Sequence, residues 1–156
     1  MPQSLSAVFV HMTFSTKGRA RAIGHPDVRE RLDAYAVGIL RKLGCPSVAA
    51  KAVIDHMHIL YIQARTVATA TVAEVVKKET SRWLKEQKPE LRDPWLLTFA
   101  WQNGYAAFSV SASKVEDARR YIGDQEMHHQ RMTFQDEYRQ LLKKHGVEYD
   151  ERYVWD

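Results

Sequence analysis

The sequence predicts an α+β fold, a ferredoxin-like split βαβ sandwich with an antiparallel sheet and C-terminal helices. Segments rich in β-branched and aromatic residues alternate with segments whose apolar residues recur at helical spacing. Their order is strand, helix, strand, strand, helix, strand, and two helical segments follow. The chain has 156 residues without internal repeats, so we expect one domain spanning residues 1–156.

The first half of the chain has the most regular pattern. Residues 7–14 are predicted to form a strand that leads into a polar, basic loop. A helix is expected at residues 26–43, and Gly44 follows where helices commonly end in a left-handed glycine. Two strands are expected at 47–54 and 56–63, and the second is apolar on both faces, as in a central strand.

The second half begins with a helix between Ala70 and Pro89, followed by a linker from Pro89 to Pro94. Residues 97–110 are expected to contain the fourth strand, and an Asn-Gly pair within them is typical of a turn.

Two more helices are expected near the C-terminal end of the sequence. Ser113 and Glu116 match a capping box, in which each side chain bonds a free backbone N–H at the start of a helix. That helix is expected to run to about His129. The second helix is expected to begin at Thr133 and to end near Gly146.

The composition allows a polyanionic partner and excludes a disulfide scaffold. Lys and Arg number 23 and Asp and Glu 19, so the net charge is +4, and the pI is near 9.2. Cys45 is the single cysteine, which rules out an internal disulfide and a cysteine-rich zinc module. We therefore expect a reducing, cytoplasmic setting. No segment has the pattern of a signal peptide or a membrane span.

His56 and His58 are the first candidate site residues. Side chains two apart on a strand point to the same face, so both imidazoles could bind one cation. A bare His-x-His pair is more often structural, with both rings bonded to backbone or solvent, and a third ligand is needed to favour a metal site.

Tyr121 and Gln125 offer such a ligand, because residues four apart are neighbours on one face of a helix. Their alternative role is a half-buried tyrosine beside a surface glutamine. His128 and His129 diverge by about 100° on a helix, so at most one of them can join the same site. A divalent cation beside a tyrosine hydroxyl favours nucleophilic attack on a phosphodiester.

Basic residues form two candidate nucleic-acid surfaces. One is the loop with Lys17, Arg19 and Arg21, and the other is the helix with Lys77 and Arg82. Each could equally be an ordinary solvated face. Neighbouring aromatic residues could add stacking platforms for single-stranded nucleic acid, although most of the tryptophans are expected in the core.

Four blocks of the sequence, 55–60, 99–110, 121–129 and 133–137, resemble the single-tyrosine HUH transposases of small bacterial insertion sequences. The resemblance includes the branch associated with repeated extragenic palindromes (REP). It implies an enzyme that cuts and rejoins single-stranded DNA through a 5′-phosphotyrosine intermediate and a free 3′-hydroxyl.

The resemblance also assigns roles to residues of this chain. The family's two histidines fall on His56 and His58, its catalytic tyrosine on Tyr121, and its additional metal ligand on Gln125. It implies Mg²⁺ or Mn²⁺, hairpin DNA ends as partner, and a bacterial cytoplasmic, nucleoid-associated location. It further implies a homodimer, whose active sites we expect to be shared between chains because the small-residue segment 104–113 could let the tyrosine helix swing away.

Two other functions are open at this point. One is a non-catalytic, domesticated relative that binds DNA hairpins and keeps vestigial histidines. The other is a zinc hydrolase that uses His56 and His58, for which no acidic residue is obviously placed as a base. Ligand softness favours zinc or copper for an imidazole site, whereas two imidazoles and one amide carry no charge and would hold magnesium weakly.

Overall fold

The computed structural model describes residues 2–87, 96 and 98–156. The linker predicted between Pro89 and Pro94 lies outside the described residues. The strands are β1 (Phe9–Ser15), β2 (Ser47–Ala52), β3 (His56–Ile62) and β4 (Ala106–Val110). The helices are α1 (Pro26–Lys42), α2 (Thr69–Lys85), α3 (Val115–Gly123), α4 (Gln125–His128) and α5 (Phe134–Lys144), with short 3₁₀ turns η1 (Lys17–Arg19) and η4 (Ala112–Lys114).

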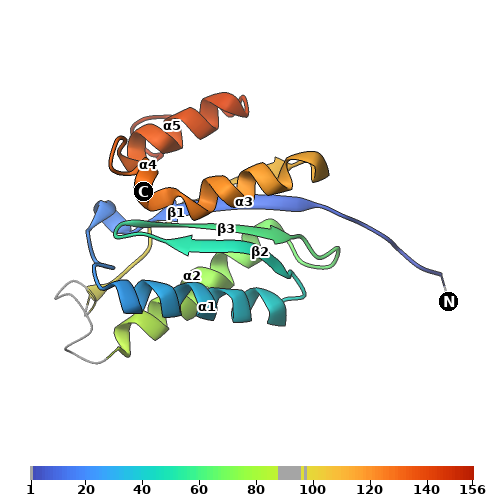
Figure 1. The fold of residues 1–156 in the computed structure, drawn as a ribbon, viewed down its shortest axis with the longest axis horizontal. Coiled ribbons are helices and arrows are strands. Elements are labelled where there is room, and N and C mark those ends of the chain that lie inside the picture. The colour runs from blue at the N-terminus through green and yellow to red at the C-terminus, as the bar shows by residue number, and fades with distance from the viewer. Residues whose placement is uncertain (1, 88–95, 97) are drawn as a thin grey trace.

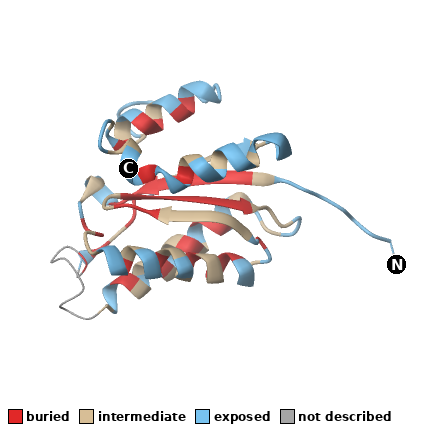
Figure 2. Ribbon diagram, in the orientation of Figure 1, coloured by how far each residue is buried: buried red, intermediate tan, exposed pale blue. Residues whose placement is uncertain are grey.

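The four strands form one antiparallel sheet in the order β2-β3-β1-β4. This is the strand order of a ferredoxin-like split βαβ fold, so the predicted fold class is confirmed. β3 and β1 are central, and Figure 2 shows them almost entirely buried. β3 is buried on both faces because helices cover both sides of the sheet, as Figure 1 shows.

Helices α1 and α2 cover one face of the sheet, and α3, α4 and α5 lie over the other (Figure 1). The first face holds the larger core, to which the strands contribute side chains such as Met12, Phe14, Met57 and Ile59. A second core lies between β4, α5 and the C-terminal residues. Phe108, Phe134 and Tyr138 are among its members, and Trp155 packs against it.

Two helix ends show why the predicted boundaries held. Gly44 has φ of +74° after α1, and the N–H groups of Gly44 and Cys45 bond back to the carbonyls of Arg41 and Leu40. This is the glycine-terminated motif that the sequence predicts. The Thr133 hydroxyl caps α5 by accepting the N–H of Asp136.

The predicted capping box at the start of α3 is wrong. Ser113 lies inside the η4 turn, and α3 begins only at Val115 without a side-chain cap. Glu116 instead pairs with Arg119 on the helix surface. The single helix expected up to about His129 is also broken: α3 ends at Gly123, and Asp124 separates it from α4. Glycine and aspartate both have low helix propensity.

Candidate active site

Two buried histidines lie side by side on β3. The side chains of His56 and His58 are on the face of the sheet that α3 and α5 cover, and neither is exposed. Their ring centroids are 5.2 Å apart. Met57, between them, belongs to the core on the opposite face. The prediction that both imidazoles share one face is therefore confirmed.

The Nδ1 atom of each histidine has a hydrogen-bond partner of its own. Asp55 Oδ1 is 2.7 Å from Nδ1 of His56, and Nε2 of His11, on β1, is 2.7 Å from Nδ1 of His58. The Nε2 atoms are thus the ones free to bind a ligand under α3 and α5. Histidines that hold metals are commonly oriented in this way through the other ring nitrogen.

Tyr121 and Gln125 approach the histidines from the layer above the sheet. Gln125 is fully buried, and its Oε1 is 3.2 Å from Nε2 of His56. The ring centroid of Tyr121 is 6.1 Å from that of His58. The pair stays together across the break between α3 and α4, since Nε2 of Gln125 is 3.5 Å from the carbonyl oxygen of Tyr121.

A carboxylate on α5 connects the histidines to the tyrosine. Glu137 is only 1% exposed, and its Oε1 is 2.9 Å from Nε2 of His58 and 3.6 Å from Nε2 of His56. Its Oε2 accepts a hydrogen bond from the hydroxyl of Tyr121. An acidic residue thus lies beside the histidines, which the sequence did not make obvious, and it could add a charged ligand to the two imidazoles and the amide.

His129 is the member of the consecutive histidine pair that joins the cluster. Its Nε2 is 3.0 Å from Oε1 of Gln125 and 3.2 Å from Oε1 of Glu137. His128 instead packs against the ring of Tyr121, with centroids 4.7 Å apart. This matches the prediction that only one of the two can serve the site.

Burial and hydrogen bonding determine the charges of these groups. Burial opposes ionisation of Glu137, but hydrogen bonds from His129, His58 and Tyr121 outweigh it and hold the pKa of Glu137 well below its usual range. Burial and the nearby Glu137 charge raise the pKa of Tyr121, so Tyr121 is a neutral phenol. Burial lowers the pKa of His58, which keeps this imidazole neutral and able to act as a ligand.

The donor atoms suit a cation. Nε2 of His56, Nε2 of His58 and an oxygen of Glu137 all lie within 4.8 Å of one another. When the Nδ1–H of His56 donates a hydrogen bond to Asp55, the Nε2 lone pair faces the oxygen atoms of Gln125 and Glu137. A cation among these atoms would satisfy all of their lone pairs. One carboxylate and one amide oxygen also add the hard ligands that magnesium and manganese prefer.

The predicted basic loop starts where β1 ends, close to the histidines. Ser15 pairs with His56 across the sheet, and Thr16 leads into η1. Lys17 and Arg21 are exposed, and Arg21 lines a cavity of about 610 Å³ together with Asp55 and His129. Arg19 lies over the ring of Trp155, with 5.7 Å from its guanidinium carbon to the ring centroid. The loop is thus adjacent to the site.

The other two predicted basic residues lie on α2, below the sheet. The ammonium of Lys77 donates to the backbone carbonyls of Gln102, Asn103 and Gly104, and burial lowers the pKa of Lys77 to about 8. With three carbonyl partners it holds the segment before β4, and its role in a DNA surface stays a prediction. Arg82 is exposed and pairs with Glu79.

Residues 4–125 match the model of the IS200-like transposase family. The chain belongs to this family. A search of curated proteins found no match. Two solved structures share its fold: a candidate transposase from Deinococcus radiodurans R1, and a REP-associated tyrosine transposase bound to a REP hairpin.

The first is 20% identical, with a TM-score of 0.61 over 80% of this chain and 98% of the other. The second is 11% identical, with a TM-score of 0.55 over 83% of this chain and 72% of the other. The family match ends at Gln125, so Glu137 lies beyond it.

One chain of this IS200-like transposase brings the whole cluster together. His56 and His58 on β3, Tyr121 on α3 and Glu137 on α5 are in contact within the same molecule. This geometry favours assembly of the site within one chain over the expected arrangement shared between chains, and a subunit-mixing experiment distinguishes the two. None of the helices in the described part of the chain is long and apolar enough to cross a membrane.

Proposed function

We propose that this chain cuts and rejoins single-stranded DNA, with Tyr121 as the nucleophile beside a divalent metal. His56, His58, Gln125 and Glu137 would hold the metal. The observation that carries the proposal is the position of Glu137, because one of its oxygens contacts the histidine pair and the other accepts the hydroxyl of Tyr121. A nucleophile and a cation-binding cluster thus share one carboxylate, within a chain that belongs to a transposase family.

The donor set favours Mg²⁺ or Mn²⁺ as the metal. Its two oxygen ligands suit these cations, and the Glu137 carboxylate supplies the negative charge that imidazole and amide ligands lack. When bound, the metal would polarise the scissile phosphate and offset the charge that develops on it.

The protein groups account for the covalent steps. The Tyr121 oxygen attacks phosphorus and the bond to the 3′ oxygen breaks, which leaves a 5′-phosphotyrosine and, after protonation, a free 3′-hydroxyl. A phenol with a raised pKa must lose its proton during attack. Its hydrogen bond to Oε2 of Glu137 would orient the hydroxyl, and the field of a bound cation would favour its deprotonated form. Attack by a 3′-hydroxyl of another strand re-forms a phosphodiester and returns the proton to Tyr121.

The partner in this proposal is single-stranded DNA that carries hairpin ends. One protein of the same fold was solved bound to a REP hairpin, which supports this choice. The exposed Lys17 and Arg21 next to the site would contact phosphates. We also propose a homodimer in the bacterial cytoplasm, associated with the nucleoid.

A metal-activated water is the second candidate for the nucleophile. Glu137 supplies the acidic group that a hydrolase needs, so the histidines could serve hydrolysis without a tyrosine intermediate. The hydrogen bond from Tyr121 to the same carboxylate favours the tyrosine.

The test uses purified protein and a pool of single strands that tile the DNA on both sides of its gene. With Mn²⁺ or Mg²⁺, we expect a protein–DNA adduct that survives denaturing electrophoresis and disappears with chelator or in Tyr121→Phe. Cleavage without adduct that persists in Tyr121→Phe would instead establish hydrolysis. DNA binding with neither cleavage nor adduct under all metal conditions would support the non-catalytic relative.

A further inference from the structure

A groove that shares no lining residue with the cavity beside His129 opens onto Tyr121. Its volume is about 640 Å³. β1 and β4 form its floor, the η4 turn and α3 form one wall, and α5 forms the other. Residues that define it are Ser109, Lys114, Tyr121, Leu141, Lys144 and His145. We call it the Tyr121 groove.

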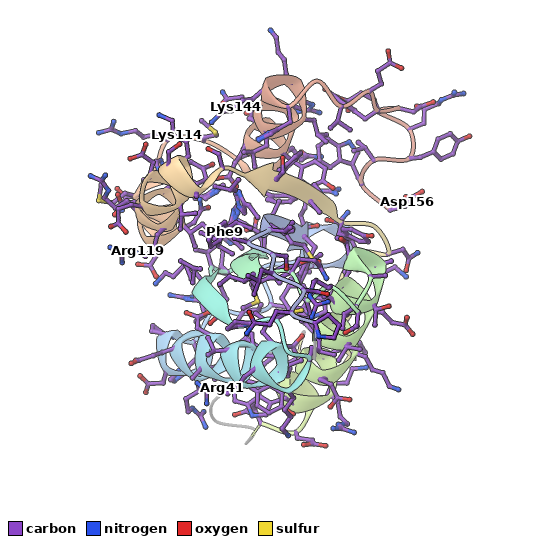
Figure 3. The ribbon with its side chains drawn as sticks, turned by 90° about the vertical axis from the view of Figure 1, so that its right-hand side faces the viewer. Phe9, Arg41, Lys114, Arg119, Lys144 and Asp156 are labelled. Carbon is purple, nitrogen blue, oxygen red and sulfur yellow. The ribbon has the colours of Figure 1, made fainter. Side chains whose placement is uncertain are left out.

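Two lysines line opposite walls of the Tyr121 groove, Lys114 on the η4 turn and Lys144 on α5. Figure 3 shows Lys114 and Lys144 on the same side of the molecule, at the ends of the layer formed by α3 and α5. Lys114 has a carboxylate partner only at 3.7 Å, in Asp117, which also binds Arg120 at 3.0 Å. Among the described residues, no carboxylate lies within ion-pair distance of Lys144. Asp117 also lines the groove, so two lysines face one carboxylate and the net charge of the lining is positive.

An aromatic ring lies next to Lys144 in the groove, at the end of α5. The His145 ring stacks on Phe108, with centroids 4.3 Å apart and an interplanar angle of 18°. Nδ1 of His145 is 2.9 Å from the carbonyl oxygen of Leu141, which fixes the ring. Rigid aromatic and apolar surfaces between cations are typical of sites that take successive nucleotides of a single strand.

We propose that the Tyr121 groove binds the one or two nucleotides next to the scissile phosphate, with Lys114 and Lys144 against the DNA phosphates. This proposal rests on the proposed function. A phosphate held at Tyr121 is covalently tied to a nucleotide on each side, so the strand must leave along a channel that starts there. The volume lies in the ~300–1,000 Å³ range of sites for small ligands, which suits single nucleotides and not a double helix.

The cavity beside His129 is a weaker candidate for the site that binds the DNA strand next to the scissile phosphate. It also contains arginines, but Glu126, which lines it, lies 3.8 Å from Arg29, and Asp55 and Asp136 add further negative charge. The two lysines of the Tyr121 groove face less opposing charge.

Binding of fluorescein-labelled (dT)12 in chelator tests the groove without any chemistry. The double variant Lys114→Gln/Lys144→Gln is compared with Lys143→Gln/Arg119→Gln, which removes the same charge from α3 and α5 outside the groove. We expect the groove variant to bind roughly tenfold more weakly at 0.1 M salt. The slope of log affinity against log salt should fall by about 0.7 per lost phosphate contact, or about 1.4 in total.

Equal losses of affinity in the two double variants, or none in the groove variant, would overturn the proposal. Because no metal is present, a failure of the tyrosine chemistry leaves this result interpretable. Photocrosslinking with 5-iododeoxyuridine in place of thymidine locates the strand directly. We expect crosslinks in the peptides that contain Tyr121 or His145, and crosslinks confined to other peptides would contradict the proposal.

Discussion

The two carboxylate oxygens of Glu137 contact different groups of the candidate site. Oε1 lies among the Nε2 atoms of His58, His56 and His129, and Oε2 accepts the Tyr121 hydroxyl. A carboxylate buried to this degree is costly unless it is paired and hydrogen-bonded. Here three imidazoles and a phenol offset that cost, and a bound cation would do so more strongly.

We expect Glu137→Gln to weaken Mn²⁺ binding by at least about tenfold, since it keeps the shape of the side chain and removes the only carboxylate in the proposed ligand set. Isothermal titration of the protein with Mn²⁺ measures this. Glu148→Gln, an exposed glutamate on the same C-terminal segment, is the matched control and should bind normally. Unchanged affinity in Glu137→Gln would remove Glu137 from the ligand set.

The positions of four site residues follow from local periodicity, and two others do not. A strand places His56 and His58 on one face, and a helical turn places Tyr121 beside Gln125. His11 and Glu137 join only through long-range contacts, across a strand pair and across 16 residues of irregular chain and helix. A signal for Glu137 did exist, because helical spacing from Phe134 to Leu141 puts this glutamate on the apolar face of α5.

At the level of elements, a hydrogen bond to the carboxyl group of Asp33 connects α1 to the edge strand β2. Oδ1 of Asp33, on α1, accepts the N–H of Ala52 at 2.7 Å. Burial raises the pKa of Asp33 from its ordinary value of 3.8 to about 7, against the lowering effect of that hydrogen bond. The protonated form is therefore favoured in the folded state.

We expect Asp33→Asn to be more stable than the wild type at pH 8 and equally stable at pH 4. The raised pKa means that the contribution of Asp33 to stability is complete below about 4 and is lost as the pH rises through about 7. The difference at pH 8 is at most about 4 kcal/mol, from about 1.4 kcal/mol per pKa unit. Urea unfolding at both pH values measures it, and a difference that does not change with pH would contradict this explanation.

The loop after β1 is the element that we expect to contact DNA phosphates outside the groove. Lys17→Gln/Arg21→Gln should reduce the salt slope of single-strand binding by about 0.7 for each lost contact. Arg41→Gln/Lys42→Gln is the control, because these exposed residues lie at the C-terminal end of α1, whereas the loop after β1 lies near the start of that helix (Figure 1). Equal salt slopes for the loop variant and the wild type would show that the loop does not contact DNA phosphates and is an ordinary solvated surface.

Helix and strand positions are predicted more reliably than the details of their ends. The periodic segments become α1, α2 and the first three strands within a few residues of the expected limits, whereas β4 occupies only Ala106–Val110 of the expected 97–110 region. The motif at Ser113 and Glu116 fails because the chain leaves β4 through a 3₁₀ turn that includes Ser113. A short local motif cannot show where a helix begins when the preceding strand fixes the path of the chain.

On the scale of the whole molecule, the site lies between the sheet and a layer that the C-terminal part of the chain completes. Residues 4–125 match the family, whereas α5 and the residues packed on it come after this match. The second core holds α5 against β4, and this packing delivers Glu137 to the histidines. The C-terminal layer is thus part of the candidate site as well as of the fold.

Because one chain contains the complete cluster, we expect no complementation between inactive subunits. A mixture of His58→Ala and Tyr121→Phe chains should remain without strand transfer after subunit exchange, which mass spectrometry can verify. Sites shared between chains would instead place both lesions in one site and leave the other intact. Recovery of up to about half of the activity per heterodimer would therefore contradict assembly within one chain.

The central claim is that Tyr121 carries the DNA, and the most direct test is to locate the covalent bond. After reaction with single-stranded DNA and Mn²⁺, digestion with nuclease and trypsin should leave a nucleotide on the peptide of residues 121–131, in which Tyr121 is the only tyrosine. We predict this modified peptide in the wild type and its absence in Tyr121→Phe. A nucleotide attached to any other peptide, or an adduct that persists in Tyr121→Phe, would contradict the account.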